Sequence, residues 1–164
     1  MVTAKVKGKT LKCKVTVTKK QAAKKNAKTA GKKNTTSDIS LQKKVISIVN
    51  KNRKKKGLEA LTMDEKLMKA AQDRAKELTK SFSHTRPNGT SCFTIFEKYK
   101  ITPTASGENI AAGQRSAAAV MDSWMNSPGH KENIMNNRFK KIGVGLVIVP
   151  NDMYSYYWVQ MFTE

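Results

Sequence analysis

The chain contains only two histidines, His84 and His130, and each lies in a short motif of polar and turn-forming residues. A third motif of this kind carries Glu108, which lies 24 residues after the first histidine and 22 before the second. No single helix or strand brings residues so far apart in sequence together. Any site that the three share must therefore be built by the tertiary fold.

Two neutral imidazoles facing one cavity can coordinate a divalent transition metal such as zinc. Two protein ligands would leave positions open to water, so His84 and His130 predict weak metal binding. Glu108 could accept a hydrogen bond from a ring N–H or from the bound water, and would fix the tautomer. The alternative is that both histidines only bond to Glu108 and to backbone groups and hold loops in place.

Positive charge is concentrated at the start of the chain. The 164 residues carry a net charge of +20, and residues 1–37 hold 12 lysines and no acidic residue. Nucleic-acid binding is disfavoured, because no recognition motif occurs and the basic segment has neither arginine nor aromatic residues. Two interpretations remain open for this segment: a solvated linker, or attachment to an anionic surface such as cell-wall polymer.

Sequence composition predicts three segments. Residues 1–18 alternate apolar and polar positions with a turn near Gly8, the pattern of one or two strands, and residues 19–37 form a lysine-rich linker without large apolar residues. Residues 38–164 form the globular domain. The first segment resembles the closing strands of a bacterial immunoglobulin-like surface repeat, which implies a fragment of a longer secreted protein.

The sequence contains no apolar run long enough to cross a membrane and no signal-peptide core at its start. The two cysteines, Cys13 and Cys92, form no metal-binding spacing. A disulfide between them is left open, and reduced, inert thiols are the default.

Periodicity predicts helices followed by a sheet. Apolar residues at 41, 45, 48 and 49 predict a helix that stops near Gly57, and a second helix is expected to start at Thr62 with a capping box to Glu65. Further helices are predicted at 92–99, 116–126 and 130–135, with a break at 127–129. Residues 142–149 and 156–162 are expected to form a hairpin at the end of the chain. The fold class is therefore α+β in three layers.

Several motifs follow one another in the globular segment. They include Phe-Ser-His-Thr-Arg-Pro-Asn-Gly at 82–89 and Trp-Met-Asn-Ser-Pro-Gly-His at 124–130, and further motifs at 61–62, 105–111, 142–145 and 157–162. With these motifs the chain resembles, over about residues 38–163, the CAP superfamily of cysteine-rich secretory, antigen 5 and pathogenesis-related 1 proteins, and within it the compact bacterial secreted branch. The resemblance implies a three-layer α-β-α sandwich of the CAP type.

The resemblance also implies a cleft lined by two histidines and two glutamates. His84, Glu108 and His130 match three of these positions, while Ser127 stands where the second glutamate is usual. Glu132 lies near His130 in sequence, but the family pattern does not move the missing role there. Three residues are then candidates for catalysis, namely His84, Glu108 and His130, and Arg86 and Asn109 join them as candidate ligand-binding residues.

The sequence is consistent with two functions for the cleft. The first is a secreted or cell-surface module whose cleft binds a small ligand, peptide, glycan or divalent metal. The second is a metal-assisted, peptidase-like hydrolase in which His84 and His130 hold zinc and Glu108 activates its water. The incomplete tetrad favours the first.

Overall fold

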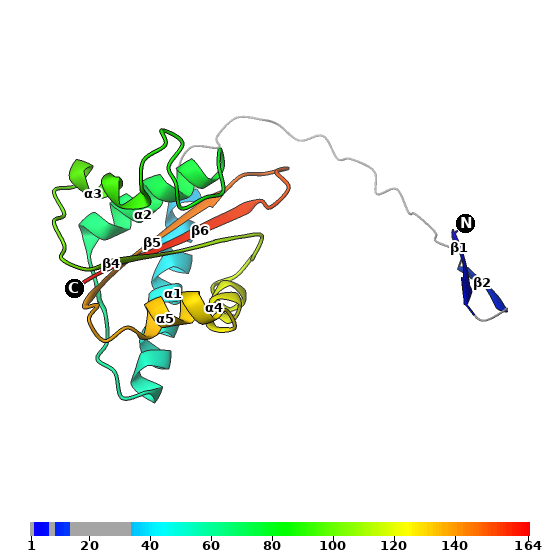
Figure 1. Ribbon diagram of the computed structural model, residues 1–164, viewed down its shortest axis with the longest axis horizontal. Helices are drawn as coiled ribbons and strands as arrows, with labels where there is room; N and C mark the ends of the chain where they lie inside the picture. Colours follow the sequence, from blue (N-terminus) through cyan, green and yellow to red (C-terminus); the bar gives the residue numbers. More distant parts are fainter. Residues whose placement is uncertain (1, 7–8, 14–33) are drawn as a thin grey trace. The chain divides into compact units, whose positions relative to one another are not determined.

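A four-stranded sheet organises the larger of two units of the chain (Figure 1). The computed structural model describes residues 2–6, 9–13 and 34–164, and side chains from Ile39 onward. The first unit, Met1–Ala30, contains β1 (Val2–Val6) paired antiparallel with β2 (Lys9–Cys13), as the alternating sequence predicts. Most of the predicted lysine-rich linker lies outside the described residues.

The second unit, Gly31–Glu164, holds the sheet in the order β3-β5-β6-β4. The predicted hairpin is confirmed: β5 (Lys141–Ile148) pairs antiparallel with β6 (Tyr156–Thr163). On its two sides the hairpin gains β3 (Thr62–Met63), which runs parallel to β5, and β4 (Ser106–Ala112), which runs antiparallel to β6. β4 is thus an edge strand, and Glu108 lies in it.

Helices cover both faces of this sheet, so the predicted three-layer α+β fold is confirmed. On one face lies α2 (Glu65–Leu78), followed by a 3₁₀ turn, η1 (Cys92–Thr94), and α3 (Ile95–Lys98). On the other lie α1 (Asn34–Lys55), α4 (Ala117–Met125) and α5 (Pro128–Met135). Alternate strand residues serve the two faces: Ile142 and Val144 belong to the core under α1, while Val159 and Met161 belong to the core under α2.

The inward faces of the helices follow their apolar periodicity. Apolar residues spaced three or four apart are buried in both α2 and α4, namely Leu67, Ala71, Ala75 and Leu78 in α2 and Ala117, Val120, Met121 and Trp124 in α4. Helix and strand approach each other closely at Gly143 and Gly145. A Cβ atom at Gly143 would lie 2.2 Å from the carbonyl carbon of Leu67. The two glycines therefore let α2 pack directly on β5.

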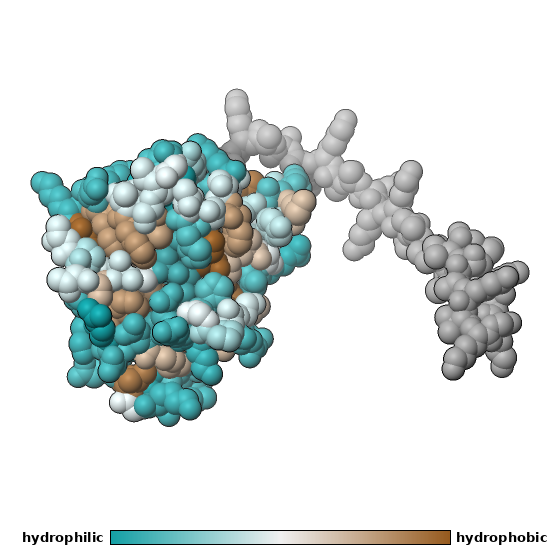
Figure 2. Space-filling view, in the orientation of Figure 1, coloured by the Kyte–Doolittle hydropathy of each residue, from teal (hydrophilic) through white to brown (hydrophobic). Residues whose placement is uncertain are grey.

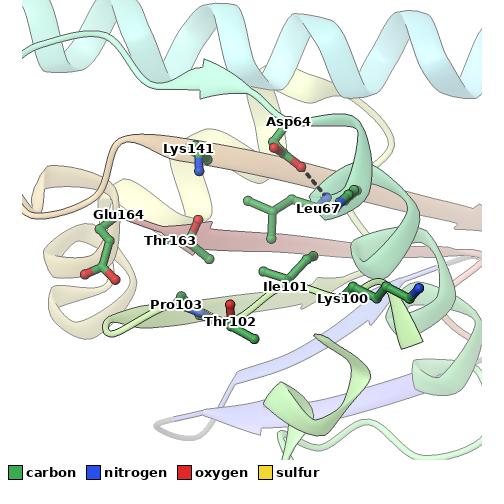
Figure 3. Close-up of a pocket in the computed structure, with 10 residues that line it drawn as sticks. Asp64, Leu67, Lys100, Ile101, Thr102, Pro103, Lys141, Thr163 and Glu164 are labelled. Atoms are coloured by element: carbon green, nitrogen blue, oxygen red, sulfur yellow. Dashed lines mark hydrogen bonds between the residues drawn. The ribbon is translucent and has the colours of Figure 1, made fainter. Parts of the chain in front are cut away.

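The prediction for the start of α2 is wrong. Thr62 lies in β3, and Asp64 is the N-cap: its side chain accepts a hydrogen bond from the Leu67 backbone N–H at 2.9 Å (Figure 3). A threonine three residues before a glutamate resembles a capping box, but Thr62 pairs with Lys141 in the sheet instead.

Asp64→Ala is expected to lower the free energy of unfolding by about 1 kcal/mol, because it leaves a helix N–H without its acceptor. Thr62→Ala should cost less, since it removes no cap. Urea denaturation of the two variants measures the difference. A larger loss of stability for Thr62→Ala would indicate that Thr62, and not Asp64, caps α2.

Two further predictions need correction. The sheet is not confined to the end of the chain, since β4 precedes α4; its sequence, Ser-Gly-Glu-Asn-Ile-Ala-Ala, has little of the β-branched and aromatic content typical of strands. The predicted break between the two helices exists but is shorter than expected, because α4 ends at Met125 and α5 begins at Pro128 rather than at His130. Proline fits the first turn of a helix, where its missing N–H would have no partner.

Candidate functional site

Glu108, the predicted centre of the site, is buried in edge strand β4 and engaged through both carboxylate oxygens. Oε1 accepts a hydrogen bond from Arg74 Nε at 2.9 Å, and Oε2 lies 2.7 Å from His84 Nδ1. The side chain of Glu108 is 1% exposed and that of His84 is 57% exposed. A fixed, buried carboxylate thus holds an imidazole at the surface. His84 and Glu108, predicted to meet, do meet.

A series of ion pairs connects Glu108 through Arg74 and Glu77 to Arg86. The fully buried Arg74 also donates to Glu77 Oε2 at 2.6 Å and to the Ser83 carbonyl at 2.9 Å, and Arg86 donates to Glu77 Oε1 from Nη2 at 2.7 Å. Burial opposes ionisation of Glu77, but hydrogen bonds from Arg86 and Arg74 outweigh it and lower its pKa. Sequence reasoning did not find Arg74 or Glu77.

Arg86, a predicted ligand-binding residue, points into this network. Its guanidinium bonds to both carboxylate oxygens of Glu77 and to Thr94 Oγ1. These contacts give it a role in holding the loop that carries His84.

The loop of His84 is closed at both ends. The Thr85–Ser91 bridge pairs its two sides, and the backbone N–H of Cys92 donates to the His84 carbonyl at 3.0 Å. Gly89 takes φ +82°, a conformation that favours glycine, at the turn predicted from Asn88-Gly89. These contacts fix the backbone position from which the His84 side chain extends.

His130 lies in the first turn of α5, which packs on the same face of the sheet as α1 and α4. Its carbonyl accepts a hydrogen bond from Asn109 Nδ2 at 3.0 Å, and Asn133 Nδ2 donates to Asn109 Oδ1 at 2.8 Å. Burial, together with the charge of His84, lowers the pKa of His130. The buried Asn109, a predicted ligand-binding residue, holds α5 against β4 through these two hydrogen bonds, and His130 is not among the residues that line the cleft around His84.

Ser127 and Glu132 do not complete a tetrad. Ser127 is the N-cap residue of α5, without a side-chain capping bond. Glu132 is exposed and lines a separate hollow with Met125, Pro128 and Met135.

Around the His84–Glu108 pair lies an open cleft of about 480 Å³. Nine residues line it: His84, Thr85, Ser91, Cys92, Phe93, Ser106, Gly107, Glu108 and Asn133. Cys92 is one of the lining residues that lie outside the sequence motifs. It is buried and free, and burial followed by the charge of Glu108 raises the pKa of its thiol to about 12. The side chain of Cys13 lies outside the described part of the chain.

Three donor groups in this cleft are close enough to share a metal ion. The ligand atoms of His84, Cys92 and Glu108 all lie within 4.8 Å of one another. Sulfur, imidazole nitrogen and carboxylate oxygen form a donor set that suits zinc. The residues present therefore fit the predicted metal, although the set contains Cys92 where the sequence suggested His130.

A second hollow, of about 440 Å³, lies at the N-terminus of α2 (Figure 3). Charged side chains of both signs line it around Leu67, among them Lys100, Lys141 and Glu164. None of the predicted site residues lines this hollow, so it is not the candidate site.

The face of the second unit that Figure 2 shows is largely hydrophilic with smaller apolar areas. Of the aromatic residues near the last strand, Tyr154 is exposed and its ring lies 6.4 Å from that of exposed Phe82, whereas Tyr157 and Trp158 are buried. Among the residues that the structure describes, no helix is both long and apolar enough to cross a bilayer.

Comparison with known proteins places this architecture. The chain is 39% identical over 126 residues to YkwD, an uncharacterized protein of Bacillus subtilis, covering 73% of the chain and 49% of that protein. The chain spans about half the length of this curated relative. An outer surface protein of Borrelia burgdorferi has a similar structure, with a TM-score of 0.69, 28% identity, and coverage of 80% of this chain and 95% of that one.

An extracellular protein of Bacillus anthracis that contains an SCP domain shares the fold, with a TM-score of 0.74 at 24% identity over 85% of this chain and 45% of that one. The family model for the cysteine-rich secretory protein family, CAP, matches residues 46–162, which span the sheet, its covering helices and the His84–Glu108 cleft. The chain therefore belongs to the CAP family of cysteine-rich secretory proteins.

Proposed function

We propose that this CAP domain is a secreted or cell-surface binding module whose cleft at His84 and Glu108 takes a small polar ligand, a peptide, a glycan or a divalent metal. The observation that carries the proposal is the pre-positioned pair itself. A buried carboxylate, clamped by Arg74, holds an imidazole that is more than half exposed at the mouth of an open cleft. Such an imidazole offers its second nitrogen to a ligand without a change of conformation.

Features of the cleft favour binding over turnover. Within the described part of the chain, neither imidazole forms a hydrogen bond with a serine or threonine hydroxyl, so no activated oxygen nucleophile is formed. The Cys92 thiol, with a pKa of about 12, is protonated near neutral pH and is a poor nucleophile. Extracellular and outer-surface relatives support the proposed location.

Metal-assisted hydrolysis is the second candidate, and the cluster of His84, Cys92 and Glu108 is the observation that favours it. A bound divalent metal would supply an activated water. Against this role, both oxygens of Glu108 already accept hydrogen bonds, which leaves the carboxylate poorly placed as a general base.

The test uses the full chain in NMR titrations with zinc, short peptides and cell-wall glycan fragments, alongside a turnover assay of the same compounds. At least one of these compounds is expected to change the NMR chemical shifts of residues 84–92 and 106–108. His84→Ala should abolish these changes, and none of the compounds should be turned over. Hydrolysis that disappears in His84→Ala would establish the enzyme instead. His130→Ala is the matched control for a histidine outside the pair with Glu108.

The lysine-rich segment 1–37 is proposed to attach the protein to an anionic cell-wall polymer. Twelve lysines without an acidic residue support it. Binding to purified teichoic acid should weaken as salt rises and should vanish when residues 1–37 are deleted. Unchanged binding by the truncated protein would contradict it.

A further inference from the structure

We infer that the metal ligands of this cleft are the Cys92 sulfur, the His84 imidazole and the Glu108 carboxylate, a zinc-selecting set with an open position, and that His130 is not among them. The inference rests on the proposed binding role of the cleft and specifies its ligand. It differs from the pair of histidines that the sequence suggested.

Convergence of the donors is the first support. All three ligand atoms lie within 4.8 Å of one another. The ligands of a tetrahedral zinc ion lie about 3.3–3.8 Å apart, given metal–ligand bonds of about 2.0–2.3 Å. Small side-chain rotations therefore suffice to bring the three donors into the coordination sphere. Within the described residues, this group of three is the one that has such spacing, and His130 is outside it.

The backbone holds the donors in these places. His84 and Cys92 lie at the two ends of one loop, which is closed by the Thr85–Ser91 bridge and by the bond from Cys92 N–H to the His84 carbonyl. Glu108 is supplied by strand β4. Rigid supports of this kind reduce the ordering cost of binding a metal.

Arg74 supplies the outer support that metal sites require. It donates to Glu108 Oε1 at 2.9 Å, while Oε2 faces His84. Outer partners of this kind orient a ligating carboxylate and strengthen metal affinity. Metal binding here would separate His84 Nδ1 from Glu108 or engage the other ring nitrogen, and Arg74 would keep the carboxylate in place in either case.

The chemistry of the donors selects the metal. Thiolate and imidazole favour zinc and its analogues over magnesium and calcium, which prefer oxygen ligands. On binding, the S–H bond of Cys92 breaks, a sulfur–metal bond forms and the proton passes to the solvent. Three protein ligands would leave one tetrahedral position free for water or another exogenous ligand. The cleft that holds the three donors is open to solvent.

The test is a cobalt(II) titration of the full chain, freed of metal by a chelator and kept reduced by a phosphine. The wild type is expected to develop a near-ultraviolet sulfur-to-cobalt charge-transfer band that zinc removes. Cys92→Ser should lose the band and bind cobalt at least about 10-fold more weakly, since loss of an outer partner alone costs about 10–100-fold. Cys13→Ser and His130→Ala should both retain the band.

The outcomes separate this inference from the proposed function. If Cys92→Ser binds cobalt as the wild type does while His130→Ala does not, the two histidines are the ligands, and this inference falls while the binding role stands. If the wild type binds neither cobalt nor zinc, the inference also falls, and the NMR titrations with peptides and glycans decide the binding role alone. Near-native circular dichroism of each variant shows that folding is not the cause.

Discussion

Replacing Arg74 with alanine is expected to lower the free energy of unfolding by about 3–5 kcal/mol, because it leaves the carboxylate of Glu108 buried without its cation. The side chains of Arg74 and Glu108 are 0% and 1% exposed, so water cannot replace the lost partner. The substitution also removes the donors to Glu77 and to the Ser83 carbonyl. The loop of His84 would lose one of its attachments to α2.

Urea denaturation at neutral pH measures this loss. Lys76→Ala is the matched control: it lies on the same helix, and its ion pair with Asp73 is at the surface, where such pairs contribute about 1 kcal/mol or less. Equal losses for the two variants would show that the Arg74 network does not support the fold as described.

Gly143→Ala is expected to be as damaging, at about 3 kcal/mol or more, since overpacking a tight core typically costs about 1–3 kcal/mol and here the obstacle is backbone. The added Cβ would lie 2.2 Å from the carbonyl carbon of Leu67 and 2.3 Å from its oxygen. Helix α2 would have to move off β5. Because α2 carries Arg74, the support of Glu108 would move with it.

Gly129→Ala is the control for this variant. Gly129 lies in the first turn of α5, has no positive φ, and a Cβ there would meet no atom within 4 Å. Alanine at such a position should leave stability unchanged or raise it by up to about 1 kcal/mol. Thermal unfolding of the two variants side by side gives the comparison, and a tolerated Gly143→Ala would mean that α2 does not pack on β5 this closely.

Elements with clear periodicity could be predicted from the sequence. The inward faces of α2 and α4 and the β5–β6 hairpin follow from the spacing of apolar residues. β4 could not be found this way, because its buried residues include Glu108 and Asn109, whose polarity serves the site and obscures the pattern of a strand. β3 has two residues, too few to show alternation.

The site was predictable only in part for a related reason. His84 and Glu108 stand in motifs, and the structure joins them. Arg74 and Glu77 occupy a helix whose lysines are all exposed, so only the tertiary fold distinguishes a buried arginine from a solvated one. Cys92 lacks a partner at metal-binding spacing in sequence, and it reaches His84 and Glu108 only because a closed loop and an edge strand bring them together.

The charge of His84 is one of the two causes that lower the pKa of His130, so the imidazole of His84 is expected to influence that of His130. Proton NMR titration of the two imidazoles, in chelator to exclude metal, tests this directly, because the chain has no third histidine. The pKa of His130 should lie below its ordinary value of 6.5 and should rise in His84→Ala, as one of its two causes is removed, while burial keeps it from rising fully. A pKa of His130 that is the same with and without His84 would contradict the account.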